Sequence, residues 1–260
     1  MNSILSVAGL SKRFGGFLAV DHVTMQVNER GIHSLIGPNG AGKTTLFNCI
    51  TGFHTPEFGQ VRLRDEDITG WSVRKRVRAG IARTFQITSL FHSISARENV
   101  ALAIRSKAGM NFDIRRLASS LADVNAKAEM LLADVGIGHL AEERVRHLSH
   151  GDQRALEVAV ALALEPQILF LDEPTAGMGR EDIGHICDIL ERLGKRIAIL
   201  LVEHDTDMVL RISDRVTVMA EGRIIADGSP DEISRSADVQ AIYLGVDVDH
   251  ASLGGAESPA

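Results

Sequence analysis

Aromatic residues are scarce in this sequence and make up only 4% of its 260 residues. With one Trp, one Tyr and nine Phe, the chain has little of the aromatic surface on which single-stranded nucleic acids stack their bases. The formal net charge of -6 at pH 7 also lacks the basic excess typical of proteins that bind phosphate backbones. Both shortages argue against nucleic acid as a partner.

Cysteines and long apolar runs are scarce as well. Cys49 and Cys187 show no spacing typical of metal or redox sites, so we expect small core residues in a reducing compartment. The most apolar stretches, 167–171 and 197–202, are far shorter than the ~20 residues of a membrane-spanning helix, and they predict buried strands. Residues 1–9 do not resemble a signal peptide. We expect a chain that is soluble by itself and reaches a membrane only through a partner.

Hydrophobic periodicity divides the chain into segments of different character. The N-terminal segment has short runs of β-branched or alternating residues, which predict strands at 3–8, 18–27 and 60–64. Between about residues 87 and 150, apolar residues recur at helical spacing in 98–107 and 114–135. This segment predicts a separate helical subdomain.

Helical and strand-like segments alternate after residue 150. The pattern predicts helices at 152–164, 181–193 and 205–212, and strands at 167–171, 197–202 and 215–219. Such alternation indicates an α/β protein with a parallel sheet covered on both faces. We expect one domain over residues 1–245, followed by a small, polar and disordered tail at 246–260.

A glycine-rich motif follows the apolar strand predicted at 32–36 and precedes a helix predicted at 43–51, which ends at Gly52. The motif matches G-x-x-x-x-G-K-[ST] and reads Gly37-Pro38-Asn39-Gly40-Ala41-Gly42-Lys43-Thr44, followed by Thr45. Its backbone N–H groups can approach phosphates at the positive end of a helix dipole. Lys43 can reach the β- and γ-phosphates, and the Thr44 hydroxyl can bind Mg²⁺. The motif predicts a nucleotide-binding P-loop but not the reaction that follows.

Two carboxylates, Asp172 and Glu173, follow the apolar run 168–171. Ligands of open α/β sheets bind at the carboxyl ends of the strands, so we expect both residues close to the P-loop. Asp172 is suited to hold Mg²⁺, and Glu173 is suited to be the base that polarises the attacking water. Acidic residues after strands are also common helix caps, but the metal of a P-loop site needs such an acid.

The order of these motifs resembles that of the ATP-binding-cassette (ABC) ATPases over nearly the whole chain. The segment Leu148-Ser149-His150-Gly151-Asp152-Gln153 is similar to the LSGGQ signature of that family. The resemblance implies a P-loop ATPase fold with an N-terminal antiparallel β subdomain, a parallel-sheet core and a helical subdomain. It also implies ATP and Mg²⁺ as ligands.

The resemblance assigns roles to single residues. Ser149 and Gly151 match residues that contact the γ-phosphate held by the opposite subunit. Gln86 matches a residue that touches both Mg²⁺ and the membrane partner, and His204 matches a histidine that contacts the γ-phosphate. Phe14 lies where an aromatic residue usually stacks on adenine. A lone histidine or a serine before a helix is more often structural, but five elements in the order of the family favour the functional interpretation.

Two motifs depart from the family pattern. In the signature, His150 replaces a glycine and Asp152 replaces the glutamine. Asp152 adds a carboxylate near the expected triphosphate, which would weaken nucleotide binding between the subunits unless His150 or Arg154 offsets it. The segment 176–179 ends in Gly179, where the family commonly has an aspartate. The catalytic residues that the resemblance implies remain: Lys43, Gln86, Asp172, Glu173 and His204. We expect this half-site to be competent; a slower opposite site would suit a heterodimer without requiring one.

Finer sequence segments resemble the ATP-binding subunits of bacterial branched-chain amino-acid importers. These segments are 13–16, 82–86, 90–91, 98–100, 176–178, 202–205 and 243–245. The resemblance implies two transmembrane permeases, a second ABC ATPase that is favoured to be different, and, indirectly, an extracytoplasmic binding protein. It places the chain at the cytoplasmic face of the bacterial inner membrane. The implied substrates are branched-chain or other hydrophobic amino acids, and urea and amide importers share many of these segments. The transported substrate leaves almost no record in the sequence of an ATPase subunit.

Other classes stay open to different degrees. A lipid or lipopolysaccharide exporter ATPase differs only in its permeases, whereas cytoplasmic ABC proteins of DNA repair or translation carry coiled coils, second cassettes or basic extensions that are not visible here. A regulator without catalysis is expected to lack Glu173 or His204, and a small GTPase needs an N-K-x-D segment, which the sequence lacks. The basic run 74–78 is interpreted as a solvated helix face rather than a membrane-side contact.

Overall fold

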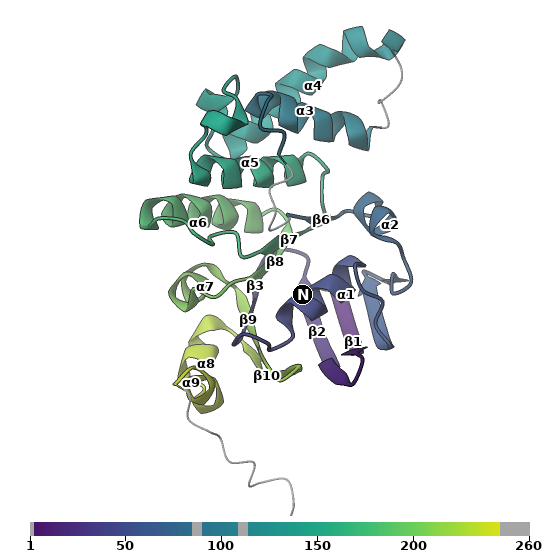
Figure 1. Cartoon of the computed structure of the whole chain (residues 1–260), viewed down its shortest axis with the longest axis vertical. Coiled ribbons are helices and arrows are strands. Elements are labelled where there is room, and N and C mark those ends of the chain that lie inside the picture. Colours follow the sequence, from purple (N-terminus) through teal and green to yellow (C-terminus); the bar gives the residue numbers. More distant parts are fainter. Residues whose placement is uncertain (1–2, 85–89, 109–113, 245–260) are drawn as a thin grey trace, which may run out of the picture.

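A computed structural model describes residues 3–84, 90–108 and 114–244 of the chain. Its first sheet is antiparallel and has the order β2-β1-β4-β5 (Figure 1). The strands are β1 (Ser3–Phe14), β2 (Phe17–Asn28), β4 (Phe58–Leu63) and β5 (Glu66–Asp67). The expected antiparallel β subdomain at the N-terminal end is therefore confirmed.

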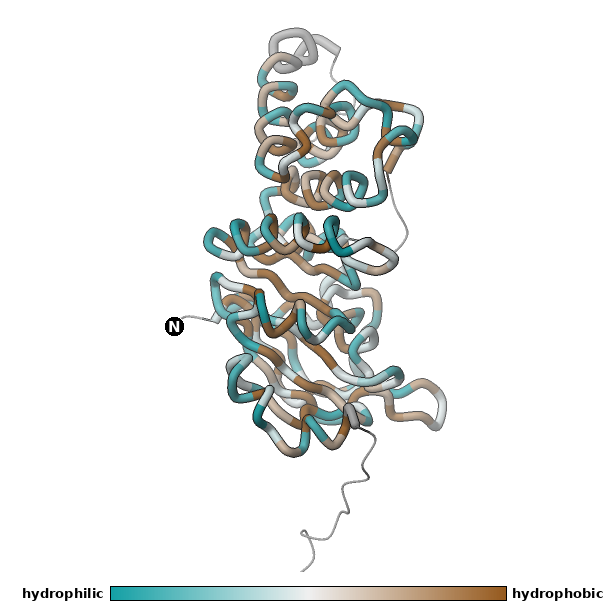
Figure 2. Tube along the Cα trace, turned by 90° about the vertical axis from the view of Figure 1, so that its left-hand side faces the viewer, coloured by the Kyte–Doolittle hydropathy of each residue, from teal (hydrophilic) through white to brown (hydrophobic). Residues whose placement is uncertain are grey.

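The second sheet has six strands in the order β10-β9-β3-β8-β7-β6. The strands are β3 (Gly31–Ile36), β6 (Ile81–Arg83), β7 (Ile168–Asp172), β8 (Ala198–Val202), β9 (Arg215–Ala220) and β10 (Arg223–Gly228). The pairings β6–β7, β7–β8, β8–β3 and β3–β9 are parallel, and only β10 runs antiparallel to its neighbour β9. The parallel-sheet core predicted from the alternating pattern is confirmed, and Figure 2 shows hydrophobic residues along these strands.

Successive residues of β7 show how the two faces of this sheet are covered. Side chains alternate between the faces of a strand. Leu169 and Leu171 pack into one core together with the helices of the upper half of Figure 1, whereas Ile168 and Phe170 pack into another core with the P-loop helix and the antiparallel sheet. Both faces are covered as predicted, but one of them is covered largely by the first sheet.

The helices lie around these two sheets. They are α1 (Lys43–Thr51), α2 (Val73–Arg78), α3 (Ala96–Lys107), α4 (Ile114–Asp134), α5 (His150–Leu162), α6 (Arg180–Gly194), α7 (Thr206–Ile212), α8 (Pro230–Arg235) and α9 (Ala237–Leu244), with 3₁₀ turns at Gly138–Leu140 and Val145–His147. Within the described ranges, no helix is both long and apolar enough to cross a membrane.

Helices α3 and α4 form the end of the molecule that lies farthest from the antiparallel sheet, with α5 beneath them (Figure 1). Helix α3 begins with a capping box, in which the Ser95 hydroxyl accepts a hydrogen bond from the Glu98 N–H and the Glu98 carboxylate accepts one from the Ser95 N–H. Helix α5 contacts α3, α4 and α6, and so connects this end to the sheet. The subdomain boundaries at about 87 and 150 stay a prediction, as does the tail at 246–260, which lies outside the described residues.

Helix α2 corrects the interpretation of the basic run 74–78. Arg76 is only 1% exposed, and its guanidinium donates hydrogen bonds to the carbonyls of Cys49 and Ile50 in the last turn of α1 and to that of Thr69 at 2.8 Å. A cation at the carboxyl end of a helix is favoured by the helix dipole. The run is therefore not a uniformly solvated face, because one of its arginines caps the P-loop helix.

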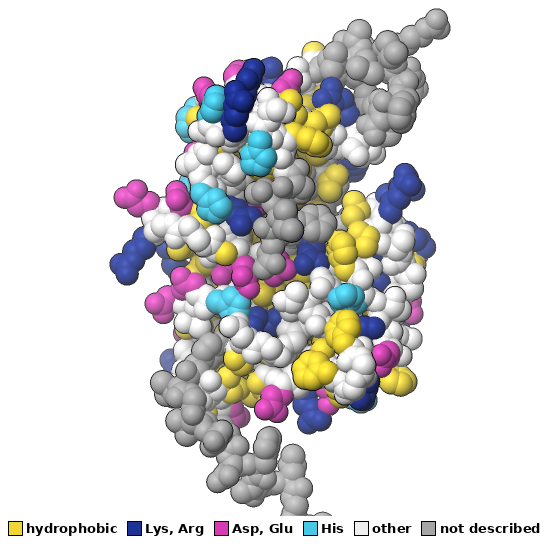
Figure 3. Space-filling view, in the orientation of Figure 1, with side chains coloured by type: hydrophobic (Ala, Val, Ile, Leu, Met, Phe, Trp, Pro, Cys, Tyr) yellow, Lys and Arg dark blue, Asp and Glu magenta, His cyan; other side chains and the backbone are white. Residues whose placement is uncertain are grey.

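Charges of both signs lie on the face drawn in Figure 3. There the Lys and Arg side chains of the described residues are scattered among acidic and polar ones.

Candidate active site

The P-loop joins β3 to α1 in a conformation that requires glycine. Gly37 and Gly42 have φ values of 150° and 97°, and a Cβ atom would lie 2.1 Å from the Met219 carbonyl oxygen at Gly37 and 2.3 Å from that of Ala19 at Gly42. Gly42 is the N-cap of α1, and Gly52, with φ of 88°, is its C-cap. The loop therefore lies between β2 and β9. Where the loop ends, the first turn of α1 begins, and its backbone N–H groups have no partner within the helix.

Lys43 extends from the first turn of α1 back across this loop. Its Nζ donates hydrogen bonds to the carbonyl oxygens of Gly37, at 2.7 Å, and Pro38, at 3.0 Å. Burial lowers the pKa of the Lys43 ammonium, while the carboxylates of Glu173 and Asp172 act in the opposite direction. The cation and the two predicted carboxylates therefore belong to one electrostatic cluster.

A cavity of about 260 Å³ opens over the P-loop. It is lined by Phe17, Ala19, Asn39, Gly40, Ala41, Gly42, Lys43, Thr44, Thr45, Glu173 and His204. Residues of the P-loop, of the end of β7 and of the end of β8 thus face one space, although they are far apart in the sequence. This is the arrangement expected for a phosphate group held by the loop and attacked from the side of Glu173.

Asp172 ends β7 beneath this cavity and is only 4% exposed. Its Oδ2 accepts a hydrogen bond from Arg83 Nη2 at 2.9 Å, and its Oδ1 has no hydrogen-bond partner among the described residues. Burial raises the pKa of the Asp172 carboxyl, while the Arg83 guanidinium lowers it. A buried carboxylate oxygen left without a donor fits a hard divalent cation, which prefers oxygen ligands.

Thr44 and Asp172 are the predicted metal ligands that the structure describes, and Gln86 lies outside the described residues. In the part of the chain that the structure describes, no three His, Cys, Asp or Glu side chains converge to hold a metal ion. In phosphoryl-transfer sites Mg²⁺ is usually held by one or two such protein oxygens together with phosphate oxygens of the substrate.

Glu173 stands directly after Asp172 with a φ of 49°, in the left-handed region that non-glycine residues rarely adopt. Its backbone N–H donates to the Val202 carbonyl at 2.9 Å, which ties the end of β7 to the end of β8. The Oε1 atom of Glu173 lies 2.7 Å from Nε2 of His204. The predicted base and the predicted histidine therefore form a hydrogen-bonded pair at the rim of the cavity.

Arg83 was not predicted as a site residue. From β6 it donates to Asp172, to Asn48 Oδ1 at 2.6 Å and to Thr51 Oγ1 at 3.2 Å, and its guanidinium lies 4.7 Å from the centre of the Phe47 ring. It therefore links the P-loop helix to the end of β7. The sequence did not mark Arg83 as a site residue, because it meets its distant partners only once β6 pairs with β7.

The predicted adenine contact, Phe14, does not line the cavity. Its ring makes an edge-on contact with His54, with the ring centres 5.2 Å apart. Phe17, which pairs with Phe14 across the β1–β2 turn and is 65% exposed, does line the cavity. The sequence signal that could have identified Phe17 is that it is the second aromatic residue beside the Gly15-Gly16 turn, directly opposite Phe14. Gln86, the remaining predicted catalytic residue, lies outside the described residues.

Ser149 and Gly151 lie at the start of α5, well separated from α1 and the P-loop (Figure 1). Ser149 is the N-cap residue: its Oγ accepts from the Asp152 N–H at 3.1 Å and donates to the Asp152 carboxylate at 2.6 Å. A Cβ atom at Gly151 would lie 2.6 Å from Oδ1 of Asp182 in α6, so glycine is needed there for close packing. The structure therefore does not bring these two residues to the P-loop of their own chain.

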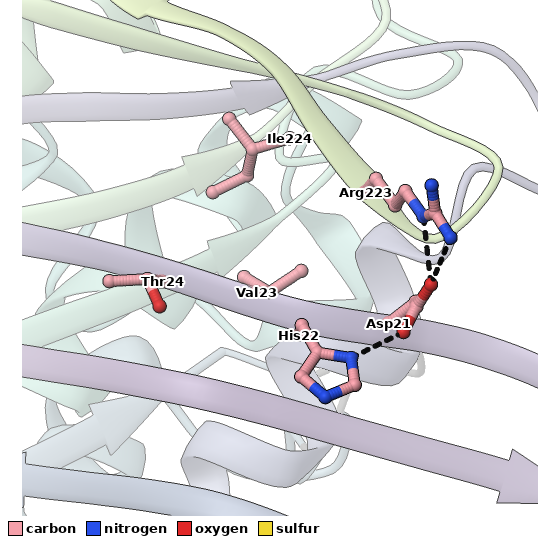
Figure 4. A pocket seen from close by; sticks show the side chains of 6 residues that line it. All are labelled: Asp21, His22, Val23, Thr24, Arg223 and Ile224. Atoms are coloured by element: carbon pink, nitrogen blue, oxygen red, sulfur yellow. Dashed lines mark hydrogen bonds and ion pairs between the residues drawn. The ribbon is translucent and has the colours of Figure 1, made fainter. Parts of the chain in front are cut away.

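A second and more open cavity of about 450 Å³ lies beside the hairpin of β9 and β10 (Figure 4). Asp21 accepts hydrogen bonds there from Arg223 Nε, at 2.7 Å, and lies 2.6 Å from His22 Nδ1. The N–H of Gly222 donates to the P-loop carbonyl of Ala41 at 3.0 Å. These contacts brace the P-loop from the outside, and none of the predicted site residues lines this cavity.

Known families and proteins match this chain over most of its length. The ABC transporter family matches residues 20–176, and the branched-chain amino acid ATP-binding cassette transporter family matches residues 223–249. The high-affinity branched-chain amino acid transport ATP-binding protein LivG of Salmonella typhimurium is 40% identical over 252 residues, which cover 93% of this chain and 98% of LivG. BraF of Pseudomonas aeruginosa, named for the same transport, is 39% identical over 250 residues, with the same coverage.

Solved structures give the same result for the fold. The ADP conformation of MJ1267, an ATP-binding cassette of an ABC transporter, has a TM-score of 0.82 and 31% identity, and the match covers 94% of this chain and 100% of that one. A nucleotide-free ATP-binding cassette from an ABC transporter has a TM-score of 0.77 and 32% identity, with 93% and 98% coverage.

Proposed function

The chain belongs to the ABC transporter ATPases, and from that premise we propose that it is the ATP-hydrolysing motor subunit of an importer of branched-chain amino acids. The observation that carries the ATPase role is the convergence of Lys43, Glu173 and His204 on one cavity above the P-loop. The identity of 39–40% with LivG and BraF over nearly their full lengths supports the transported substrate.

The P-loop would bind the β- and γ-phosphates of ATP through its backbone N–H groups and the Lys43 ammonium. Mg²⁺, held by Thr44, Asp172 and Gln86, would neutralise charge on the phosphate oxygens. On the open side of the γ-phosphate, the Glu173 carboxylate would accept a proton from the attacking water. The water oxygen forms the new bond to phosphorus, and ADP leaves with the electrons of the broken P–O bond.

His204 is placed to do two things in this step. Its ring is hydrogen bonded to Glu173, which fixes the direction of the carboxylate. Its position in the cavity lining would also let it contact the γ-phosphate. Asp172 cannot take over as the base, because it is buried beneath the loop and is paired with Arg83. Phe14 or Phe17 would stack on the adenine ring.

Complete catalysis would require a second cassette. Ser149 and Gly151 lie at the start of a helix, away from the P-loop of their own chain, so they would contact ATP bound by a partner in a head-to-tail dimer. Asp152 already accepts a hydrogen bond from Ser149, so its carboxylate would accompany that serine to the partner's phosphate. Repulsion there would weaken the partner's site, which favours a heterodimer with a different ATPase.

The motor would act at the cytoplasmic face of the bacterial inner membrane, bound to two permeases. An extracytoplasmic binding protein would deliver the amino acid to the permeases without contact to this chain. ATP can drive the permeases only through its preference for the closed dimer, and the helical end formed by α3, α4 and α5 would pass that closure on.

A tagged pull-down from native membranes tests this assembly. The bound proteins are identified by mass spectrometry, and we expect two hydrophobic permeases and a second ABC ATPase. Recovery of only soluble proteins, ribosomes or DNA would contradict the transport role and leave a cytoplasmic ATPase. Recovery of permeases whose binding protein takes up urea, amides or lipids would keep the motor and replace the substrate.

A further inference from the structure

Glu203, which follows β8 directly and precedes His204, is a buried acid without a cationic partner. It is 3% exposed, and in the described part of the chain it forms no ion pair with Lys, Arg or His. An isolated carboxylate buried in this way is costly unless hydrogen-bond donors surround it. Contact with a ligand in the nucleotide cavity does not explain this buried acid, because Glu203 is not among the residues that line the cavity.

Three donors from two loops satisfy this carboxylate. Its Oε1 accepts hydrogen bonds from the backbone N–H of Thr175 at 3.0 Å and from the Thr175 hydroxyl at 2.6 Å. Its Oε2 accepts from the backbone N–H of His204 at 3.0 Å. Thr175, which is itself buried, comes two residues after Glu173. The Glu203 side chain therefore fixes the main chain at Thr175, close after Glu173, and at His204.

The same two loops are joined at two further points. The Glu173 N–H donates to the Val202 carbonyl at 2.9 Å, and Glu173 Oε1 lies 2.7 Å from His204 Nε2. The Val202 contact is made by backbone at the strand ends and the Glu203 contact is buried, whereas the Glu173–His204 contact is open to solvent. Because the open contact joins the same two loops as the protected ones, its geometry depends on them.

The anchored turn also contains its own hydrogen bonds. The Ala176 N–H donates to the Glu173 carbonyl at 3.2 Å, and the Met178 N–H donates to the Thr175 carbonyl at 3.1 Å. Holding Thr175 in place therefore orients the whole turn that begins at Glu173. The strained φ of 49° at Glu173 needs such support, since a residue in this region relaxes unless its surroundings fix it.

We propose that Glu203 is a positioning residue for ATP hydrolysis: it holds Thr175 and the main chain of His204 so that Glu173 and His204 meet above the γ-phosphate. The inference rests on the proposed ATPase function. Within the described residues, Glu203 bonds only Thr175 and His204 and does not line the cavity, so its loss acts on the rate of the chemical step and leaves nucleotide binding almost unchanged.

Two substitutions test this role in the assembled membrane complex. Glu203→Gln keeps the shape but replaces one acceptor oxygen with an NH₂ group, so either Thr175 or His204 loses its acceptor. Thr175→Val removes only the hydroxyl, and Thr175→Ser restores it. We expect Glu203→Gln and Thr175→Val to lower kcat about tenfold, the size of one lost bond to a buried charged group, with the KM for ATP changed less than twofold. Thr175→Ser should return kcat close to that of the wild type.

The ring ¹⁵N signals of His204, recorded on the isolated chain labelled at histidine, report the contact with Glu173 directly. We expect them to move in Glu203→Gln and Thr175→Val and to stay in place in Thr175→Ser. An unchanged kcat in Glu203→Gln, or a KM that rises as kcat falls, would overturn the positioning role. If the wild-type complex does not hydrolyse ATP, the proposed function fails instead, and an unmoved His204 signal then overturns the positioning role separately.

Discussion

The Nε2 atom of His204 lies 2.7 Å from Oε1 of Glu173, across the carboxyl ends of the neighbouring parallel strands β8 and β7. The two residues are 31 positions apart in the sequence, and both line the cavity above the P-loop. The contact gives the carboxylate a defined direction toward the place where a γ-phosphate would lie. On this geometry we propose Glu173, rather than the buried Asp172, as the group that would meet the attacking water.

Glu173→Gln removes the acceptor for the proton of that water. We expect the ATPase rate of the assembled complex to fall by about 10²–10⁴-fold, the range that a positioned base contributes, while ATP binding is retained. The rate is measured as phosphate release and the binding with a fluorescent ATP analogue. Glu66→Gln, at an exposed position of the antiparallel sheet, is the control and should leave both values unchanged. Undiminished turnover in Glu173→Gln would remove Glu173 from the role of base.

Gly42→Ala tests the conformation of the P-loop. The new methyl group would meet the Ala19 carbonyl oxygen at 2.3 Å, at a φ of 97° that alanine avoids. We expect the affinity for ATP to fall by about 5- to 150-fold, because strain of this kind costs about 1–3 kcal/mol. Gly184→Ala is the matched control, because no atom lies within 4 Å of its added methyl group and alanine favours the interior of helix α6. Equal affinity in the two variants would contradict the geometry of the loop.

His33 makes stability depend on pH. Burial lowers its pKa to about 4, against opposing effects from Asp227, while the Arg215 charge lowers it further. The unfolded chain therefore binds more protons than the folded chain between pH 6.5 and 4, and stability falls as the pH falls through this window. We expect the free energy of unfolding to drop by about 2 kcal/mol from pH 7.5 to 5, measured by denaturant titration.

The contribution of His33 is separated by substitution. His33→Gln keeps a hydrogen-bonding group toward Thr217 but cannot take up a proton, so most of this drop should disappear. His22→Gln, at a largely exposed histidine, should keep the full drop. A drop of equal size in His33→Gln would show that other groups cause the acid sensitivity.

Arg76 stabilises the end of the P-loop helix. Arg76→Gln would remove the guanidinium donor from the carbonyls of Ile50 and Thr69 and leave that of Cys49 only the Gly52 N–H. We expect the free energy of unfolding to fall by about 3 kcal/mol or more, since each unsatisfied buried group costs about 1–3 kcal/mol. Arg74→Gln, an exposed position on the same helix, should change it by less than about 0.5 kcal/mol. Similar losses of stability in both variants would support the interpretation of the basic run 74–78 as a solvated helix face.

Ser149→Ala separates the role of the signature from that of a helix cap. The N-cap hydrogen bond is lost in either role, at a cost of about 1 kcal/mol. Ser229→Ala removes the same kind of cap from α8 and serves as the control. We expect only Ser149→Ala to lower the ATPase rate of the assembled complex, while ATP binding to the isolated chain stays the same in both variants. Equal rates in the two variants would argue against a head-to-tail dimer.

Segments defined by local chemistry could be predicted from the sequence. The helix predicted at 43–51 has the observed bounds Lys43–Thr51, because glycines with positive φ stand at both its ends. The predicted strand at 167–171 is observed at Ile168–Asp172, because the strand is buried on both faces and carries a continuous apolar run. The pairing of the P-loop with Asp172 and Glu173 followed from the rule that ligands bind at the carboxyl ends of strands.

Segments defined by distant partners could not be predicted. Strand β1 extends to Phe14, beyond the predicted end at residue 8, because register shifts after Val7 break its alternating pattern. Strand β6 has only three residues and exists through its pairing with β7. The contact of Arg83 with Asp172 spans 89 positions, and that of Glu203 with Thr175 spans 28. Neither pair has a local pattern that marks it.

Uptake of labelled leucine into proteoliposomes tests the central claim most directly. The complex is purified with its permeases, reconstituted with ATP at the side of the ATPase, and supplied with its binding protein. With the wild-type chain we expect leucine to accumulate together with phosphate release, and with Glu173→Gln we expect both to stop while the complex stays assembled. Accumulation that continues with Glu173→Gln, or ATP hydrolysis that leucine and its binding protein leave unchanged, would contradict the account.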